Sequence, residues 1–157
     1  QVILGNTCMY GATGGELFAL GRAGERFGVR NSGAYAVVEG AGDHCCEYMT
    51  GGVIVVRGGT GRNVGAGMTG GVAFLLDETG GVRPRVNAEI VEVVSITTPQ
   101  QESLLRSLLE MHVSTTASTK AKALLSDWTN SMSAFKVLVP PSERAAMGLF
   151  ERTAVTA

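Results

Sequence analysis

Short apolar runs recur at regular intervals through the first half of the chain, and each follows a Thr-Gly or Ser-Gly step. The four copies cover residues 13–20, 32–39, 50–57 and 69–76, so their starts lie 19, 18 and 19 residues apart. Short apolar runs bounded by glycine are typical of β-strands. A fixed period of this kind indicates a solenoid, in which each repeat is one coil that is stable only when stacked on its neighbours.

Glycine marks a second register between these copies. The spacing Gly21-x-x-Gly24-x-x-x-Gly28 returns 37 residues later at Gly58, Gly61 and Gly65. At a tight corner the backbone often needs positive φ, which a residue without Cβ adopts at no steric cost. Because the copies contain strands and no helix, the pattern predicts a mainly β fold: a parallel β-helix of 18–19-residue coils over residues 1–95.

The glycine pattern stops near residue 81, and of the 22 glycines only Gly148 lies beyond that point. Residues 96–157 therefore differ in composition from the first part, and we expect them to form a C-terminal helical appendage with a short strand and a tail. Thr98-Pro99 has the composition of a helix start, with the Thr hydroxyl as the cap and Pro at the first helical position. The first helix then presents one apolar face, made by Leu104, Leu105, Leu108 and Leu109.

A second helix is predicted from near Ser118, with Ala121, Leu124, Leu125 and Trp128 on one face. Residues 135–139 predict a short strand, ended by Pro140-Pro141, and the tail beyond stays open. Since a solenoid leaves exposed ladder ends that invite aggregation, we expect the helices to cover an end or to clamp one face.

Charge and composition exclude several classes of function. The formal net charge is -1, which argues against nucleic acid and against a polybasic membrane anchor. No apolar stretch approaches the roughly 20 residues that a membrane span requires. Three cysteines, two of them adjacent, fit a reducing compartment better than a disulfide framework. The chain opens at Gln1 in strand-like sequence without an initiator Met, so we expect a piece of a longer protein.

One stretch matches a dinucleotide-binding fingerprint. Gly65-Ala66-Gly67-Met68-Thr69-Gly70 has the G-x-G-x-x-G spacing, and Glu89 lies about where a ribose-binding acid would. That chemistry requires a helix directly after the glycines, to aim its N-terminus at the pyrophosphate. The residues that follow form a strand of the repeat, so we reject the dinucleotide site.

His44-Cys45-Cys46 contains metal-ligating side chains. Neighbours on a strand point to opposite faces, so at most His44 and Cys46 are expected to share an ion. Since no C-x-x-C and no second ligand pair accompany them, buried cysteines and a hydrogen-bonded histidine are the favoured interpretation.

Two enzyme classes are built on β-solenoids. Polysaccharide lyases project acids and arginines from one outer face, and the residues available for this are Asp43, Glu47 and Arg62, or Glu25 with Arg22 and Arg26. Charges at corners more often solvate the surface or pair across adjacent coils. The hexapeptide helix of acyltransferases needs an aliphatic-Gly step every six residues. Here Phe27-Gly28 and Val64-Gly65 are two full periods apart, so that fold is rejected.

Several phrases closely resemble the C-terminal glycine-repeat (GXGXG) domain of the glutamate synthase large (alpha) subunit. The resemblance is nearly collinear through Asp77 and continues less tightly through Arg85-Val86-Asn87 and the helical pair with Trp128. The phrases that carry it are Gly5-Asn6-Thr7, Tyr10-Gly11-Ala12-Thr13-Gly14-Gly15, Gly21-Arg22-Ala23-Gly24-Glu25-Arg26-Phe27, Val29-Arg30-Asn31-Ser32-Gly33-Ala34, Val37-Val38-Glu39-Gly40, Gly42-Asp43-His44, Cys46-Glu47-Tyr48-Met49-Thr50-Gly51-Gly52 and Thr60-Gly61-Arg62-Asn63.

The resemblance implies a right-handed parallel β-helix within a large cytoplasmic or plastid flavoenzyme. That oxidoreductase converts glutamine, 2-oxoglutarate and reductant into two glutamates, using FMN and an iron–sulfur cluster. The implied partners are the amidotransferase and FMN-binding synthase domains of the same chain, with a reductase subunit or ferredoxin as electron source.

We expect no catalytic, cofactor-binding or metal-binding residue in this segment. The nucleophilic cysteine, the flavin site and the cluster cysteines of the family lie upstream of it, and Cys8, Cys45 and Cys46 lack cluster spacing. The expected role is a rigid spacer that holds the amidotransferase and synthase domains at fixed separation. Two alternatives stay open: a scaffold subunit of another redox complex, similar to a formylmethanofuran dehydrogenase subunit, and, less favoured, an autonomous polysaccharide lyase.

Overall fold

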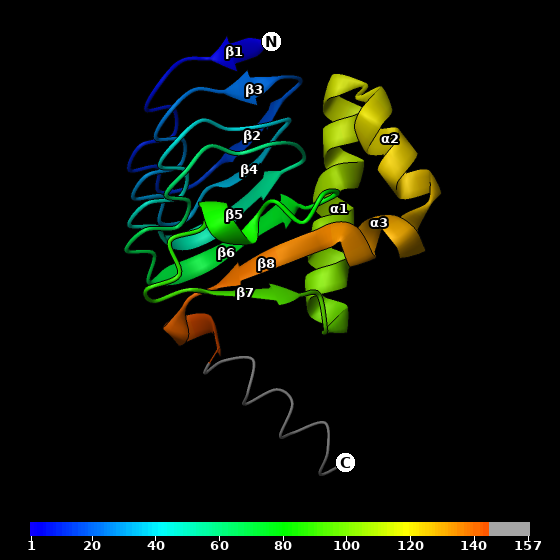
Figure 1. Cartoon of the computed structure of the whole chain (residues 1–157). Coiled ribbons are helices and arrows are strands. Elements are labelled where there is room, and N and C mark those ends of the chain that lie inside the picture. Colours follow the sequence, from blue (N-terminus) through cyan, green and yellow to red (C-terminus); the bar gives the residue numbers. More distant parts are fainter. Residues whose placement is uncertain (145–157) are drawn as a thin grey trace.

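The computed structural model describes residues 1–144 and shows a β-solenoid with helices packed along one side (Figure 1). In chain order the elements are β1 (Val2–Leu4), β2 (Glu16–Ala19), β3 (Arg22–Ala23), β4 (Tyr35–Val38), β5 (Thr50–Val56), β6 (Gly70–Leu76), η1 (Arg83–Arg85), β7 (Glu92–Ser95), α1 (Pro99–Thr116), α2 (Thr119–Ser126), α3 (Trp128–Ala134) and β8 (Phe135–Val139).

The repeated apolar runs form one parallel ladder. Strands β2, β4, β5 and β6 are hydrogen-bonded in that order, and equivalent residues of successive copies lie opposite one another, as in Glu16 with Tyr35, Tyr35 with Val53 and Val53 with Val72. The strand spacing along the sequence is therefore the coil length. This confirms the predicted mainly β solenoid of 18–19-residue coils.

Each coil also turns at a corner that lies away from the helices, here called the far corner (Figure 1). This corner is not a simple glycine turn. Residues with positive φ alternate there with right-handed ones, and the columns that stack are Thr7, Arg26, His44 and Asn63; Met9, Gly28, Cys46 and Gly65; and Gly11, Arg30, Tyr48 and Gly67. Eight of these twelve residues carry a Cβ, so the expectation that glycine supplies positive φ at the corners is too narrow. Bonds between coils offset the local strain.

These corner bonds run in both directions. The amides of His44 and Tyr48 donate forward to the carbonyls of Arg62 and Ala66, at 2.8 and 2.9 Å. The amide of Cys46, between them, donates back to the carbonyl of Phe27 at 2.9 Å. The corner is thus a ladder in its own right, made by alternating backbone handedness.

Glycine is required where one coil approaches the next. A Cβ on Gly51 or Gly70 would lie well inside contact distance of the Ser32 or Thr50 carbonyl oxygen of the preceding coil. At Gly14, the equivalent position of the first copy, nothing lies within 4 Å. Glycine is therefore needed in the Thr-Gly step because the backbones of adjacent coils stack closely there.

Two apolar cores flank the ladder because alternate side chains of each strand point to opposite faces. Ile54, Ala73 and their equivalents fill the inside of the solenoid with Phe27 and Met49. The other set, which includes Val55 and Phe74, packs against α1 and α2. Burial of this outer set fixes the helices on the sheet.

The helices were expected to cover an end of the ladder or to clamp one face. A helix clamps the face, and a strand covers the end. Helix α1 lies along the outer face of the sheet (Figure 1), where Leu105, Leu108 and Leu109 are buried. The open edge of β6 is covered by β8, which pairs with it in antiparallel fashion, and β7 adds to the other side of β8.

The helix starts follow the sequence signals, whereas one helix is shorter than expected. The Thr98 hydroxyl accepts a hydrogen bond from the Gln101 amide, and the Ser118 hydroxyl accepts one from the Ala121 amide. The predicted second helix is interrupted, because α2 ends at Ser126 and α3 begins at Trp128 after Asp127. Ala121, Leu124, Leu125 and Trp128 nevertheless all pack in the outer core, as predicted. The tail after Pro141 lies largely outside the described residues.

Candidate functional site

Charged side chains lie where the parallel strands end and the helices begin. Glu39 directly follows β4 and Arg57 directly follows β5; their preceding residues, Val38 and Val56, are opposite one another in the sheet. The end of α1 and the start of α2 cross above this point. The seam between solenoid and helices thus brings charged side chains from strand ends next to the helix caps.

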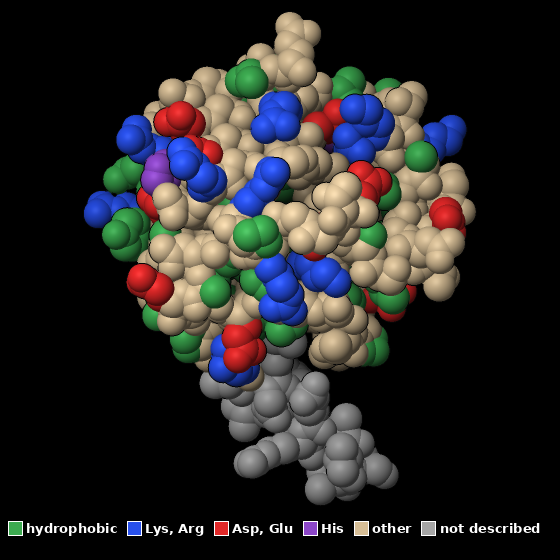
Figure 2. Space-filling view, in the orientation of Figure 1, with side chains coloured by type: hydrophobic (Ala, Val, Ile, Leu, Met, Phe, Trp, Pro, Cys, Tyr) green, Lys and Arg blue, Asp and Glu red, His purple; other side chains and the backbone are tan. Residues whose placement is uncertain are grey.

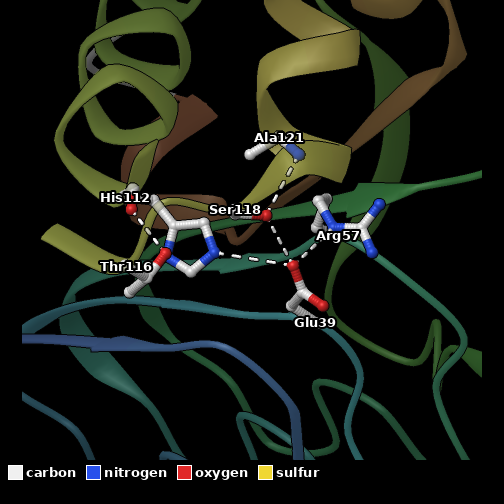
Figure 3. Close-up of polar contacts among 6 residues, drawn as sticks. All are labelled: Glu39, Arg57, His112, Thr116, Ser118 and Ala121. Carbon is white, nitrogen blue, oxygen red and sulfur yellow. Dashed lines mark hydrogen bonds and ion pairs between the residues drawn. The ribbon is translucent and has the colours of Figure 1, made fainter. Parts of the chain in front are cut away.

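Glu39 Oε1 is the centre of this seam (Figure 3). It accepts a hydrogen bond from Ser118 Oγ at 2.7 Å and lies 3.4 Å from Arg57 Nε. Ser118 Oγ also accepts from the Ala121 amide at 3.1 Å, so one hydroxyl caps α2 and holds the carboxylate. Two elements 79 residues apart in sequence are thereby connected.

His112 approaches the same carboxylate from α1. Its Nε2 lies 3.8 Å from Glu39 Oε1, too far for a hydrogen bond, and the side chain is fully buried. Neither ring nitrogen has a hydrogen-bond partner among residues 1–144. Burial, the largest influence, lowers the pKa of His112 despite the nearby Glu39 carboxylate. The imidazole is therefore neutral at neutral pH, and its contact with Glu39 becomes an ion pair only on protonation.

The pKa of Glu39 is also lowered. Burial acts in the opposite direction, but the Ser118 hydrogen bond and the nearby charges of Arg57 and Lys120 together outweigh it. The carboxylate is ionised at neutral pH. The seam thus holds one anion, Glu39, against a guanidinium and a hydroxyl.

An open polar cleft of about 580 Å³ lies beside Glu39. Its cations are Arg22, Arg57 and Lys120, and its acids are Glu39 and Glu78. Ile3 and Leu20, which are 50% and 51% exposed, form an apolar side. A smaller cavity of about 230 Å³ adjoins it through Gly58 and Gly59.

The small cavity is closed on one side by the last partial coil. Arg85 Nη1 donates to the Thr60 carbonyl, and Val64 forms a parallel bridge with Val86. The Thr60 hydroxyl is buried and has no hydrogen-bond partner in the described part of the chain. These contacts join the loop after β6 to the coil below it.

The cleft is suited to binding a charged group and lacks the elements of common catalytic sites. No nucleophile and base lie in hydrogen-bond contact among the residues that line it. Nor do residues 1–144 contain a group of three or more His, Cys, Asp or Glu side chains that could hold a metal ion.

The G-x-G-x-x-G match has no helix after it. Gly70 is the first residue of β6, which runs to Leu76. Glu89 is exposed and its amide donates to Asn87 Oδ1 at 3.3 Å. The strand that the repeat predicts after these glycines is therefore present.

His44, Cys45 and Cys46 do not alternate between two faces as expected. These residues lie in the corner of alternating handedness and not in a strand, so the two-face rule fails there. Cys45 and Cys46 both point into the core, with their sulfurs 3.5 Å apart, and the pKa of Cys46 is raised well above its ordinary value by the Cys45 contact and by burial. His44 Nδ1 lies 2.6 Å from Glu47 Oε1.

The acids and arginines available for a lyase site do not gather in one place. Some of them pair with one another, and others lie apart. Asp43 Oδ1 accepts from the Arg62 amide of the next coil at 2.8 Å, and this bond lowers the Asp43 pKa. Arg22 lines the cleft and donates to the Ala41 carbonyl, which directs it away from the cluster with Glu25 and Arg26 that a lyase site would use. Charges at this corner mainly join adjacent coils.

The sequence interpretation missed the seam itself. Glu39 and Arg57 are the eighth residues of adjacent repeat copies, and the equivalent positions of the other copies are Leu20 and Leu76. Opposite charges at a position that is otherwise apolar were the available signal. His112 and Lys120 gave no signal, because nothing local places them near strand ends.

The family model for the GXGXG motif matches residues 1–141. The chain is 60% identical over 144 residues to ferredoxin-dependent glutamate synthase 2 of Synechocystis sp., covering 92% of this chain and 9% of the relative. It is 60% identical over 141 residues to ferredoxin-dependent glutamate synthase 1, chloroplastic/mitochondrial, of Arabidopsis thaliana, covering 90% of this chain and 9% of the relative.

The chloroplastic ferredoxin-dependent glutamate synthase of Spinacia oleracea is 55% identical over 153 residues, covering 96% of this chain and 9% of the relative. The chain thus spans about a tenth of the length of the relatives it matches. None of the helices among residues 1–144 has the length and apolar character needed to cross a membrane.

Proposed function

The chain belongs to the GXGXG motif family, and on that premise we propose that it is the C-terminal, non-catalytic domain of a ferredoxin-dependent glutamate synthase. The complete enzyme would form two glutamates from glutamine, 2-oxoglutarate and reductant. Its amidotransferase and FMN-binding synthase domains would be the partners of this domain within the same polypeptide.

The observation that carries the proposed role is the continuous ladder. One sheet runs from β2 through β6 and is sealed by β8 and β7, while α1 is fixed across its outer face. Each coil is held to the next by backbone hydrogen bonds in the strand ladder and at the far corner, so that every repeat is fixed on its neighbours. Such a body suits a spacer that keeps the two ends of an ammonia channel in register.

Cofactors, electron donor and location follow from the same proposal. FMN and an iron–sulfur cluster would be held by the other domains, and none of the residues of this chain would ligate them. Ferredoxin would supply the electrons; the relatives are named ferredoxin-dependent. The enzyme would work in the cytoplasm or in a plastid.

The proposal is tested on the purified 157-residue chain. We expect no glutamine hydrolysis and no flavin absorbance when the chain is expressed in a host with FMN. Glutaminase activity or stoichiometric flavin would overturn the non-catalytic role.

A second measurement addresses the spacer role in the full-length enzyme. Disturbing the ladder, as in Gly70→Val, should raise the glutamine hydrolysed per glutamate formed, because ammonia escapes when the domains lose register. Gly14→Ala, at the open equivalent position, should leave this ratio unchanged. Equal ratios for both variants, with both correctly folded, would exclude the spacer.

A further inference from the structure

Arg57 is a nearly buried cation whose binding capacity the fold leaves unused. Its side chain is 11% exposed, and only Nε meets Glu39, at 3.4 Å. The two terminal nitrogens point away from Glu39 (Figure 3), and Nε itself is buried without a hydrogen-bond partner within residues 1–144. Because Arg57 lines the 580 Å³ cleft, this part of the guanidinium is available to a group that enters it.

The surroundings of Arg57 favour a negative group. Arg22 and Lys120 line the same cleft, on a molecule whose drawn face carries Lys and Arg side chains interspersed with acidic ones (Figure 2). Of the two acids, Glu39 is already engaged by Ser118 and Arg57, which leaves Glu78 on the exposed rim. With Glu39 and Arg57 paired, two further cations, Arg22 and Lys120, face one further acid, Glu78.

The cleft is shaped for a polypeptide segment more than for a free metabolite. It is open, and Ile3 and Leu20 present half-exposed apolar surface beside the cations. Arginine anchors next to exposed apolar side chains are characteristic of protein interfaces. Small-molecule sites, by contrast, enclose most of the ligand within apolar walls.

We propose that this cleft is a docking site for an acidic polypeptide segment, in which an Asp or Glu carboxylate pairs with Arg57 between Arg22 and Lys120 and a neighbouring apolar side chain covers Ile3 and Leu20. The inference rests on the proposed function, since the segment would come from another domain of the same enzyme. The chain covers only 9% of its relatives, so such a segment would have ample length from which to come.

The geometry explains why this contact would be specific. A guanidinium receives a carboxylate in bidentate fashion, and an Arg that is already largely desolvated loses little hydration on pairing. Since Arg57 also contacts Glu39, the docked carboxylate would be joined to the seam between the solenoid and α1. A docked domain would therefore contact the solenoid and the helices together.

Zero-length cross-linking of the full-length protein tests the docking site. A water-soluble carbodiimide joins a Lys amine to a carboxylate only where the two are in ion-pair contact. Peptide mapping should find Lys120 joined to an Asp- or Glu-containing peptide from outside these 157 residues. Lys120 joined only to Glu39 or Glu78, or not joined at all, would overturn the proposal.

Charge variants supply the controls. Arg22→Glu should lower the yield of this cross-link at least about tenfold, because it places a like charge beside the incoming carboxylate. Arg22→Gln should lower it less, which covers the case that reversal prevents folding. Lys122→Glu, on the same helix but outside the lining of the cleft, should leave the yield unchanged. Equal yields in wild type and Arg22→Glu, with equal melting temperatures, would also refute the site.

A final arm separates this inference from the proposed function. The isolated chain is titrated with glutarate while the Arg57 Nε–H signal is followed by NMR. Tight, saturable binding of glutarate would show a metabolite site and overturn docking; only weak shifts without saturation support it. Failure of docking leaves glutamine hydrolysis and flavin content of the isolated chain unchanged, so the two ideas fail on different measurements.

Discussion

The two sides of each coil are held together in different ways. At the far corner, adjacent coils are joined by backbone hydrogen bonds between residues of alternating handedness, such as the Cys46 amide to the Phe27 carbonyl. At the seam, the solenoid is joined to the helices by side chains, above all Glu39 with Ser118 and Arg57. Backbone bonding is set by stacking and tolerates varied side chains, whereas the seam depends on a few identities. Mutations where coils stack should therefore act mainly by steric overlap. Mutations at the seam should act by removing specific polar contacts.

The largest effect is expected where coils touch. Gly70→Val should destabilise the fold by about 4 kcal/mol or more, because the new side chain would displace the Thr50 carbonyl of the preceding coil. Urea unfolding of the variant measures this. Gly14→Ala, at the same repeat position with open space, should change stability by less than about 0.5 kcal/mol. Similar losses at both glycines would mean that flexibility and not stacking selects glycine.

The next effect concerns the outer core between sheet and helix. Leu109→Ala should cost about 2–5 kcal/mol, because Leu109 is fully buried and its removal leaves a cavity. Leu104→Ala, on the same helix but only partly buried, should cost clearly less. Thermal unfolding of the two variants provides the comparison. A loss at Leu104 as large as that at Leu109 would contradict the observed face of α1.

A smaller loss is expected from the seam hydroxyl. Ser118→Ala removes both the cap of α2 and the bond to Glu39, and should destabilise the chain by about 1–2 kcal/mol. Ser126→Ala is the matched control, because the exposed Ser126 hydroxyl donates only to the Lys122 carbonyl of its own helix. If Ser118→Thr does not recover most of the loss, the hydroxyl is not the cause.

The smallest effect is the pH dependence that His112 contributes. Its pKa in the folded chain is lowered from its ordinary 6.5 by burial, so between the folded and unfolded pKa values the unfolded chain binds more protons. Stability is therefore fully present above pH 6.5 and declines as the pH falls toward the folded pKa. His112→Leu should be less sensitive to pH over that interval in urea titrations. An unchanged pH profile would show that His112 does not titrate differently in the folded chain.

The carboxylate of Glu39 follows the same sign at lower pH. Its folded pKa lies below the ordinary 4.5, so its contribution is present above that value and is lost as the pH falls through the folded pKa. The seam should thus loosen on acidification in two stages, His112 first. The far corner has the Asp43 carboxylate as its counterpart, but Asp43 lies at the surface and its contribution is screened by solvent.

The sequence was sufficient for the solenoid because stacking repeats itself. Thr13, Ser32, Thr50 and Thr69 begin equivalent strands, and the same period sets the register of the sheet. Helix caps at Thr98 and Ser118 were also predictable, since capping is local. The antiparallel pairing of β8 with β6 was not predictable, because strands so far apart along the chain leave no local sequence pattern. The handedness of Cys46 and Tyr48 was missed for the opposite reason: side chains that ordinarily avoid positive φ adopt it under the bonding of neighbouring coils.

The position of β8 also has a consequence for biosynthesis. The ribosome delivers β6 well before Phe135–Val139, so the nascent solenoid carries a bare ladder edge while α1 to α3 are still being made. An unsealed edge of this kind can recruit another nascent chain. Slow translation between residues 77 and 134 would prolong that exposure, and synonymous codons in this interval should influence the yield of soluble protein.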